Sequence, residues 1–251
     1  MAVIDPRLPD LLRGSRPLLG MFCGIPSPAL IEMCGHAGFD FVIIDNEHGS
    51  ANFETTEHLI RAARGCGILP VVRTFEADVA RTLDCGASAI QVPLVNTAAQ
   101  AQRIVKMAKY PPVGDRGAAF STRAAGFGFF GGADHVTRSN EGIAVIVQIE
   151  TTEAIANLDD ILKVPGIDAA FIGPNDLSFS MGHSGNFNHP DVQKAMIEAI
   201  RKIAAAGVAP GTLALNPDEW KRFTALGAKF LPMVITPLIA NAFRAAVAMK
   251  G

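Results

Sequence analysis

One local pattern recurs along the chain: a helical stretch ends at a glycine, and a β-rich run follows within a few residues. Glycine suits the left-handed residue that commonly closes a helix and turns the chain back toward a sheet. The six copies are "CGHAGFDFVIID", "ARGCGILPVVRT", "LDCGASAIQVPLV", "VPGIDAAFIGP", "AAGVAPGTLAL" and "LGAKFLPMVI". This repeated joint predicts that helix and strand alternate through the chain.

Two further apolar runs, "LLGMFCG" and "AVIVQIE", complete the set of predicted strands. Apolar residues at helical spacing, with charges on the opposite face, predict helices over residues 54–64, 97–109, 151–162 and 190–205. Near-continuous apolar strands are typical of a parallel sheet covered by helices. Eight of them in 251 residues predict one (β/α)8 TIM barrel domain over residues 1–251. An open doubly wound sheet is the alternative, but no GxGxxG or GxxxxGK[ST] motif follows a strand.

The segment 110–142 interrupts this alternation. It is rich in glycine and proline and is predicted to be one long irregular insertion. Loops of this length usually have a function.

Composition and charge exclude several classes of protein. Hydrophobic residues make up 49% and charged residues 18%, which favours a large core over disorder. Lys+Arg 22 against Asp+Glu 24, with no basic block, predicts no nucleic-acid partner. No apolar stretch approaches the roughly 20 residues that span a bilayer, so no membrane partner is expected. The stretch "MAVIDPRLPDLLRG" lacks a signal-peptide core, which predicts a cytoplasmic location.

The four cysteines are Cys23, Cys34, Cys66 and Cys85. They show no CxxC spacing and lie in or beside apolar segments, so they are interpreted as reduced packing residues. A nucleophilic cysteine is the alternative.

Several predicted strands end in polar residues, and the active site of such a barrel lies at the carboxyl ends of its strands. Glu150 and Asp176 follow the fifth and sixth strands. Two carboxylates that face one cavity repel each other unless a cation compensates their charge. Oxygen ligands with room for water and substrate suit Mg²⁺ or Mn²⁺ better than a closed zinc site. The alternative is that Glu150 caps the helix that begins in "ETTEAI".

Arg73 ends the strand "LPVVRT" and would present a planar fork to the cavity. A carboxylate or phosphate bound through two oxygens is its natural ligand, and a structural salt bridge is the alternative. The backbone around Gly173, Asn175 and Asp176 could hold a second oxygen of the same anion.

The stretch "IIDNEHGS" places three titratable groups where a strand ends. Asp45 is the acid at the strand end, and His48 follows close enough to be oriented by it as a general acid/base. Glu47 could accept a hydrogen bond from a metal-bound water without contacting the metal itself. The other histidines are interpreted as structural: His36, His58, His135, His183 and His189.

Six stretches, in order and spacing, resemble the HpcH/HpaI aldolase family of metal-dependent class II pyruvate aldolases. They are "FDFVIIDNEHGS", "PVVRT", "LDCGASAIQVPLV", "YPPVGDRG", "VQIET" and "GIDAAFIGPNDLS". The resemblance implies that Glu150 and Asp176 bind the metal, that Arg73 and Gln148 contact the 2-oxo acid, and that Asp45 and His48 form the acid/base pair. It also implies that Asp84 reaches the site of a neighbouring subunit. The implied assembly is a hexamer, a trimer of dimers, with the last helix, in "TPLIANAFRAAVAMKG", exchanged between partners.

The expected activity is reversible cleavage of 4-hydroxy-2-oxo acids, with pyruvate or hydroxypyruvate as enolate donor and an aldehyde as acceptor. The implied cofactor is Mg²⁺, Mn²⁺ or Co²⁺. Leu213, Leu215, Val234 and "GFGFF" are candidates for the acceptor wall, and Arg116 and Arg123 leave phosphorylated acceptors open. The alternatives are a citrate-lyase-like acyl-CoA lyase, which would need a CoA groove, and a catalytically silent barrel that acts as a binding protein.

Overall fold

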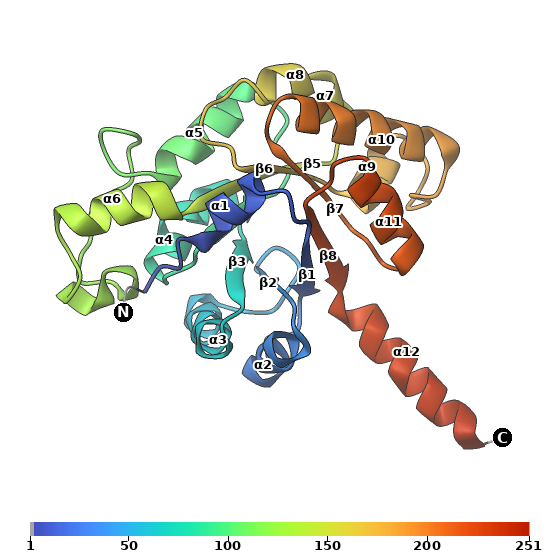
Figure 1. Cartoon of the computed structure of the whole chain (residues 1–251), viewed down its shortest axis with the longest axis horizontal. Helices are drawn as coiled ribbons and strands as arrows, with labels where there is room; N and C mark the ends of the chain where they lie inside the picture. Colours follow the sequence, from blue (N-terminus) through green and yellow to red (C-terminus); the bar gives the residue numbers. More distant parts are fainter. Residues whose placement is uncertain (1–2, 251) are drawn as a thin grey trace.

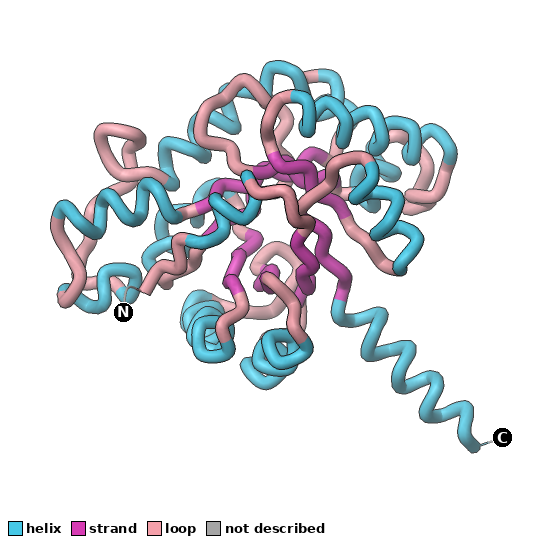
Figure 2. Tube along the Cα trace, in the orientation of Figure 1, coloured by secondary structure: helices cyan, strands magenta, loops and turns pink. Residues whose placement is uncertain are grey.

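The computed structural model describes residues 3–250, and its strands form a closed parallel barrel (Figures 1 and 2). Each strand pairs with the next, and β8 pairs with β1. The strands are β1 (Leu18–Cys23), β2 (Phe41–Asp45), β3 (Leu69–Arg73), β4 (Ala89–Val92), β5 (Ala144–Ile149), β6 (Ala169–Ile172), β7 (Ala209–Thr212) and β8 (Phe230–Val234). The predicted (β/α)8 barrel is therefore confirmed, and the open sheet is excluded.

Helices alternate with these strands around the barrel (Figure 1). They are α1 (Arg7–Arg13), α2 (Pro28–Ala37), α3 (Phe53–Cys66), α4 (Val79–Asp84), α5 (Ala98–Ala108), α6 (Ala133–Gly142), α7 (Thr152–Ala156), α8 (Leu158–Ile161), α9 (Pro174–Ser180), α10 (Pro190–Ala205), α11 (Pro217–Ala225) and α12 (Ile235–Val247). Short 3-10 helices cover Glu76–Asp78, Arg123–Gly128 and Ala248–Lys250. Within residues 3–250, no helix is both long enough and apolar enough to span a bilayer.

The glycine joints act as predicted where α2 and α3 end. Gly38 and Gly67 follow these helices with φ of 93° and 80°, and their N–H groups bond back to carbonyls of the last turn. This left-handed conformation costs glycine nothing sterically, because glycine has no Cβ. The chain then turns directly into the next strand.

The apolar side chains form two packed layers, as the alternation along each strand requires. Inside the barrel, Phe41 stacks on Phe230 with ring centroids 4.1 Å apart, and Phe171 meets Phe230 edge-on. Leu8 and Leu12 of α1 belong to this inner cluster. The larger cluster, which includes Ile44 and other strand residues of the opposite face, packs against the outer helices.

Two predicted elements differ in the structure. The predicted helix over residues 151–162 divides into α7 and α8 at Asn157, whose side chain donates to the backbone oxygen of Asn96 at 2.9 Å. The predicted irregular insertion 110–142 contains α6 in its last third. This helix has few apolar residues, and it is held by tertiary contacts such as the bond from Tyr110 N to Asn140 Oδ1 at 2.7 Å. The low apolar content of α6 therefore gave little sign of a helix in the sequence.

Candidate active site

A cavity of about 420 Å³ opens at the carboxyl ends of the strands. Most of the predicted site residues meet there, because parallel strands of a barrel all end at the same mouth. Its lining residues are Phe22, Gly24, Asp45, His48, Arg73, Gln148, Phe171, Gly173, Pro174, Asn175, Asp176, Leu213, Val234 and Thr236.

Arg73 is held rigidly at the cavity wall by two carboxylates. Its Nε and Nη2 donate to the two oxygens of Asp45 at 2.8 and 2.6 Å, and its Nη1 lies 2.9 Å from Oε2 of Glu47. Its guanidinium also lies 4.6 Å from the centre of the Phe22 ring. Burial alone would raise the pKa of Asp45, but the bonds and charge of Arg73 outweigh it and bring this pKa below its usual range. Arg73 thus both forms a salt bridge and faces the cavity.

His48 lies at the mouth of the cavity, with 67% of its side chain exposed. The structure differs here from the expectation that Asp45 orients the imidazole. Asp45 Oδ1 instead accepts from the backbone N–H groups of Glu47 and His48, at 3.1 and 3.3 Å. The carboxylate beside the ring is Glu47, whose Oε2 lies 3.9 Å from Nε2 of His48. Burial raises the pKa of Glu47, although the charge of Arg73 partly opposes this.

Glu150 lies behind the cavity wall, between the lining residues Gln148 and Gly173, and only 1% of it is exposed. Its Oε1 accepts from the backbone N–H of Leu94 at 2.8 Å, and its Oε2 accepts from Gln148 Nε2. Burial raises the pKa of Glu150 to about 7, and the negative charge of Asp176 adds to this effect. The alternative helix-capping role is wrong, because Thr151 provides the cap: its Oγ1 accepts from Ala154 N at 3.0 Å.

The residues around Glu150 fit a hard divalent cation. Within residues 3–250, Glu150 has no cationic partner, since Arg73 pairs with Asp45 and Glu47. Position 173 must be glycine for Glu150 to keep this position, because a Cβ there would lie 2.5 Å from Glu150 Oε2. Asp176 stands exposed in the first turn of α9 and adds a second carboxylate. A set of oxygen donors with free space beside it suits Mg²⁺ or Mn²⁺.

Sequence reasoning missed Gln91, a polar residue of the otherwise apolar β4. Its Nε2 donates to Gln148 Oε1 at 2.5 Å, and Gln148 in turn donates to Glu150. The Oε1 atom of Gln91 is buried without a hydrogen-bond partner among the described residues. A single polar residue inside an apolar strand was the available signal.

Other predicted residues lie away from this cavity. Asp84 pairs with the buried Arg116 at 2.7 Å, so its role in a neighbouring site stays a prediction. Leu213 and Val234 line the cavity, whereas Leu215 lines a separate small hollow and Phe129 of "GFGFF" is exposed elsewhere. Arg123 bonds the backbone oxygen of Cys85 at 2.8 Å, and neither Arg116 nor Arg123 reaches the cavity of its own chain.

The four cysteines are free thiols, as expected from their spacing. Burial raises the pKa of Cys34 to about 11 and also raises the pKa of Cys23 and Cys85. A thiol with a raised pKa is a poor nucleophile at neutral pH. The geometry therefore favours the packing role.

Comparison with known proteins agrees with this geometry. The sequence profile of the HpcH/HpaI aldolase/citrate lyase family matches residues 18–236. A 4-hydroxy-2-oxo-heptane-1,7-dioate aldolase of Klebsiella pneumoniae is 40% identical over 243 residues, which cover 95% of this chain and 91% of that protein.

Two solved structures extend the comparison. A HpcH/HpaI aldolase/citrate lyase family protein of Burkholderia cenocepacia is 32% identical with a TM-score of 0.92, and the match covers 98% of this chain and 99% of that one. The citrate synthase SbnG is 31% identical with a TM-score of 0.87, and the match covers 97% and 96% of the two chains. The resemblance carried by the six ordered motifs is thus confirmed: the chain belongs to the HpcH/HpaI aldolase/citrate lyase family.

Proposed function

We propose that this protein is a divalent-metal-dependent class II aldolase, a carbon–carbon lyase that reversibly cleaves 4-hydroxy-2-oxo acids. The observation that carries the proposal is the buried carboxylate of Glu150, which has no cationic partner in the described part of the chain and lies beside the cavity that Asp176 and Arg73 line. The 40% identity with a 4-hydroxy-2-oxo-heptane-1,7-dioate aldolase over 95% of the chain supports the same reaction class. Pyruvate or hydroxypyruvate would be the donor and an aldehyde the acceptor.

Members of this family in general depend on a divalent metal. We assign Glu150 and Asp176 as its ligands, with Mg²⁺, Mn²⁺ or Co²⁺ as the ion, because both residues offer carboxylate oxygens. Held by these two residues, the ion would supply Lewis-acid stabilisation of the negative charge that develops on the donor when the enolate forms.

The remaining cavity residues would bind and orient the donor. Arg73, which Asp45 holds in one orientation, offers a positive charge to the anionic donor without rearranging. Gln148 is fixed between Gln91 and Glu150 and presents an amide to the same space. Gly173 has no side chain to cap the first turn of α9, so the N–H groups of Asn175 and Asp176 can bond an oxygen of the donor.

The acceptor would lie toward the mouth, where Leu213 and Val234 form the apolar part of the lining. An apolar wall discriminates between substrates by only about 1 to 3 kcal/mol per methylene. We therefore expect a broad range of aldehydes.

His48 is placed to exchange a proton with the hydroxyl that becomes the aldehyde oxygen. Its imidazole is exposed at the mouth, and its Nε2 lies 3.9 Å from Oε2 of Glu47. Replacing His48 by alanine should lower kcat for aldol cleavage by about 10² to 10⁴-fold, because positioned general acid/base groups contribute that much.

Steady-state kinetics and metal titration of the His48→Ala variant check this role. Metal affinity should stay unchanged, since His48 is not among the assigned ligands. His58→Ala, an exposed histidine of α3, is the matched control. Loss of metal binding in His48→Ala, with normal turnover once metal is saturating, would instead make His48 a ligand.

Metal removal tests the proposed function itself. Dialysis against a chelator should abolish pyruvate release from 4-hydroxy-2-oxo acids, and Mn²⁺, Co²⁺ or Mg²⁺ should restore it. A panel of aldehydes with pyruvate and hydroxypyruvate, assayed with each ion, identifies donor, acceptor and metal together. Full activity after exhaustive metal removal would contradict the proposal. Cleavage of CoA thioesters without action on free 2-oxo acids would favour the acyl-CoA lyase, and complete inactivity would favour a binding protein.

We further propose a homo-oligomer, a hexamer built as a trimer of dimers, in which α12 is exchanged between partners. In support, α12 extends away from the barrel (Figure 1), and its apolar residues Leu238, Phe243 and Val247 are exposed. Such a surface normally packs against another chain. In such an assembly we expect Asp84 to approach the site of a neighbouring subunit. Light scattering should give the mass of six chains.

A further inference from the structure

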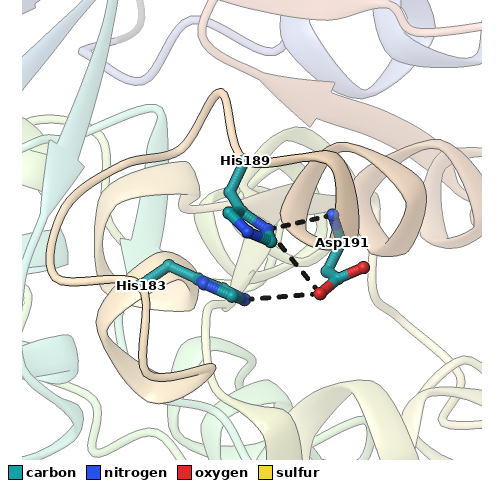
Figure 3. A group of neighbouring side chains, drawn as sticks. All are labelled: His183, His189 and Asp191. Atoms are coloured by element: carbon teal, nitrogen blue, oxygen red, sulfur yellow. Dashed lines mark hydrogen bonds and ion pairs between the residues drawn. The ribbon is translucent and has the colours of Figure 1, made fainter.

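A second group of metal-binding side chains lies outside the cavity. His183 comes from the loop after α9, and His189 and Asp191 lie at the start of α10 (Figure 3). Among residues 3–250, they form the one trio of His, Cys, Asp or Glu whose ligand atoms all lie within 4.8 Å of one another. None of the three lines the proposed active site. The histidines were interpreted as structural from the sequence, and the structure brings them together.

A nitrogen of each imidazole lies near the same carboxylate oxygen of Asp191. The rings stack with centroids 3.6 Å apart and planes at 16°. His183 Nε2 and His189 Nδ1 lie 3.8 and 3.6 Å from Oδ2 of Asp191 (Figure 3). Ligand atoms around a tetrahedral Zn²⁺ are about 3.4 Å apart, given bonds of about 2.0 to 2.2 Å. The spacing of the ligand atoms is thus close to that of a zinc site. Because an imidazole binds a metal in the plane of its ring, one of the two rings would rotate out of the stack to complete the coordination.

Backbone hydrogen bonds hold the loop that carries the two histidines. His183 N donates to Ser178 O at 2.7 Å, Asn186 N donates to His183 O at 2.9 Å, and His189 N donates to Asn186 O at 3.0 Å. The backbone of the loop is thus tied at both histidines, so an ion would have to order the side chains and not the backbone, which lowers the entropic cost of binding.

The chemical state of the trio also suits a metal. Nδ1 of His189 accepts from the backbone N–H of Asp191 at 3.2 Å, so this nitrogen carries a lone pair, as a metal ligand must. On metal binding, Nδ1 of His189 would lose this weak helix-capping hydrogen bond and coordinate the ion instead. The side chains of His183, His189 and Asp191 are 22%, 35% and 67% exposed, so an ion can reach them from solvent.

We propose that His183, His189 and Asp191 form a second metal site, one that binds an imidazole-preferring transition metal such as Zn²⁺. Two imidazoles and one carboxylate favour Zn²⁺ or Co²⁺ over Mg²⁺, which prefers oxygen ligands. Three protein ligands leave the fourth position to water. The bound ion would clamp the loop between α9 and α10 to the first turn of α10. This loop directly follows the helix that carries Asp176.

The test separates this site from the proposed catalytic one. In a Glu150→Gln/Asp176→Asn background, which lacks both assigned catalytic ligands, calorimetry should still detect one Zn²⁺ per chain and no Mg²⁺. Co²⁺ should show the visible absorption of a tetrahedral complex. Adding His183→Gln should weaken Zn²⁺ binding by more than about tenfold, because even the loss of an outer-shell partner costs 10 to 100-fold. Zn²⁺ should raise the Tm of the background protein and not that of the His183→Gln variant.

Two further variants control for fold and chance binding. His189→Asn removes the imidazole but keeps a good helix cap, so it should lose Zn²⁺ with α10 intact. His36→Gln, at an exposed histidine of α2, should bind Zn²⁺ as the background protein does. Zn²⁺ binding of unchanged stoichiometry and affinity in both His183→Gln and His189→Asn would overturn the proposal. That result leaves the proposed aldolase function untouched, since the catalytic ligands are absent from every protein compared.

Discussion

Replacing Glu150 by glutamine will reduce the rate of aldol cleavage by about 10³-fold or more. The reason is that the variant loses the buried carboxylate assigned to the metal, and metal stabilisation of an enolate amounts to several kcal/mol, with 1.36 kcal/mol for each factor of ten. The shape is preserved, because Leu94 N can still donate to the amide oxygen. The new amide nitrogen at position 150 needs an acceptor. Rotating the amide of Gln148 would supply one, and rotating that of Gln91 would then let its Oε1, which has no partner among residues 3–250, accept from Gln148.

Metal titration with measurement of proton release checks this result. The pKa of Glu150 is raised to about 7, so the carboxyl group is largely protonated below that pH and a proton must leave when a metal binds. Metal affinity of the wild type should therefore fall as the pH drops below 7, and proton release should vanish in Glu150→Gln. Glu153→Gln, at an exposed glutamate of α7, should behave as wild type. Tight metal binding and normal turnover in Glu150→Gln would refute the assignment.

Replacing Arg73 by alanine will lower kcat/KM for the 2-oxo acid by about 10² to 10³-fold, the usual effect of removing one preorganised donor to developing charge. The same change leaves two carboxylates, the buried Asp45 and the partly buried Glu47, without their cation. Breaking a buried pair in this way costs about 3 to 5 kcal/mol of stability. Arg73→Lys keeps the charge but loses the bidentate fork, so it should recover stability more than donor binding.

Urea unfolding at several pH values separates the two effects. Arg73 lowers the pKa of Asp45, so the pair contributes stability above the ordinary carboxyl pKa of about 4, and the contribution is lost as the pH falls below it. The deficit of Arg73→Ala should accordingly be full at neutral pH and shrink in acid. Arg103→Ala, which breaks an exposed pair with Glu76, should change stability by less than about 1 kcal/mol. Unchanged pyruvate kinetics in Arg73→Ala would exclude Arg73 from donor binding.

The barrel could be predicted because its signals are local. A glycine such as Gly38, which ends a helix in the left-handed conformation, and the apolar run of β2 that follows it both lie within about ten residues of sequence. Repetition of that unit then leaves few ways to pair the strands. The helix α6 escaped prediction because its bonds to Tyr110 come from a distant part of the chain.

That residues such as Arg73, Gln148 and Asp176 meet at one cavity could also be predicted, because the ends of the parallel strands converge whatever their sequences. The choice of partner within the site could not. Asp45 lies directly opposite Arg73 in the register of β2 and β3, and it therefore bonds that guanidinium rather than the ring of His48, its neighbour in sequence. Gln91 reaches Gln148 across 57 residues of chain.

Short-range patterns thus specify which residues form strands, helices and the mouth of the barrel. They carry no information on which charged or polar side chains approach within about 3 Å, since that depends on strand register and on loops that fold over them. The grouping of His183 and His189 with Asp191 likewise depends on tertiary structure. The two rings stack only because the loop that joins α9 to α10 folds back on itself, and no short-range pattern in the sequence indicates this.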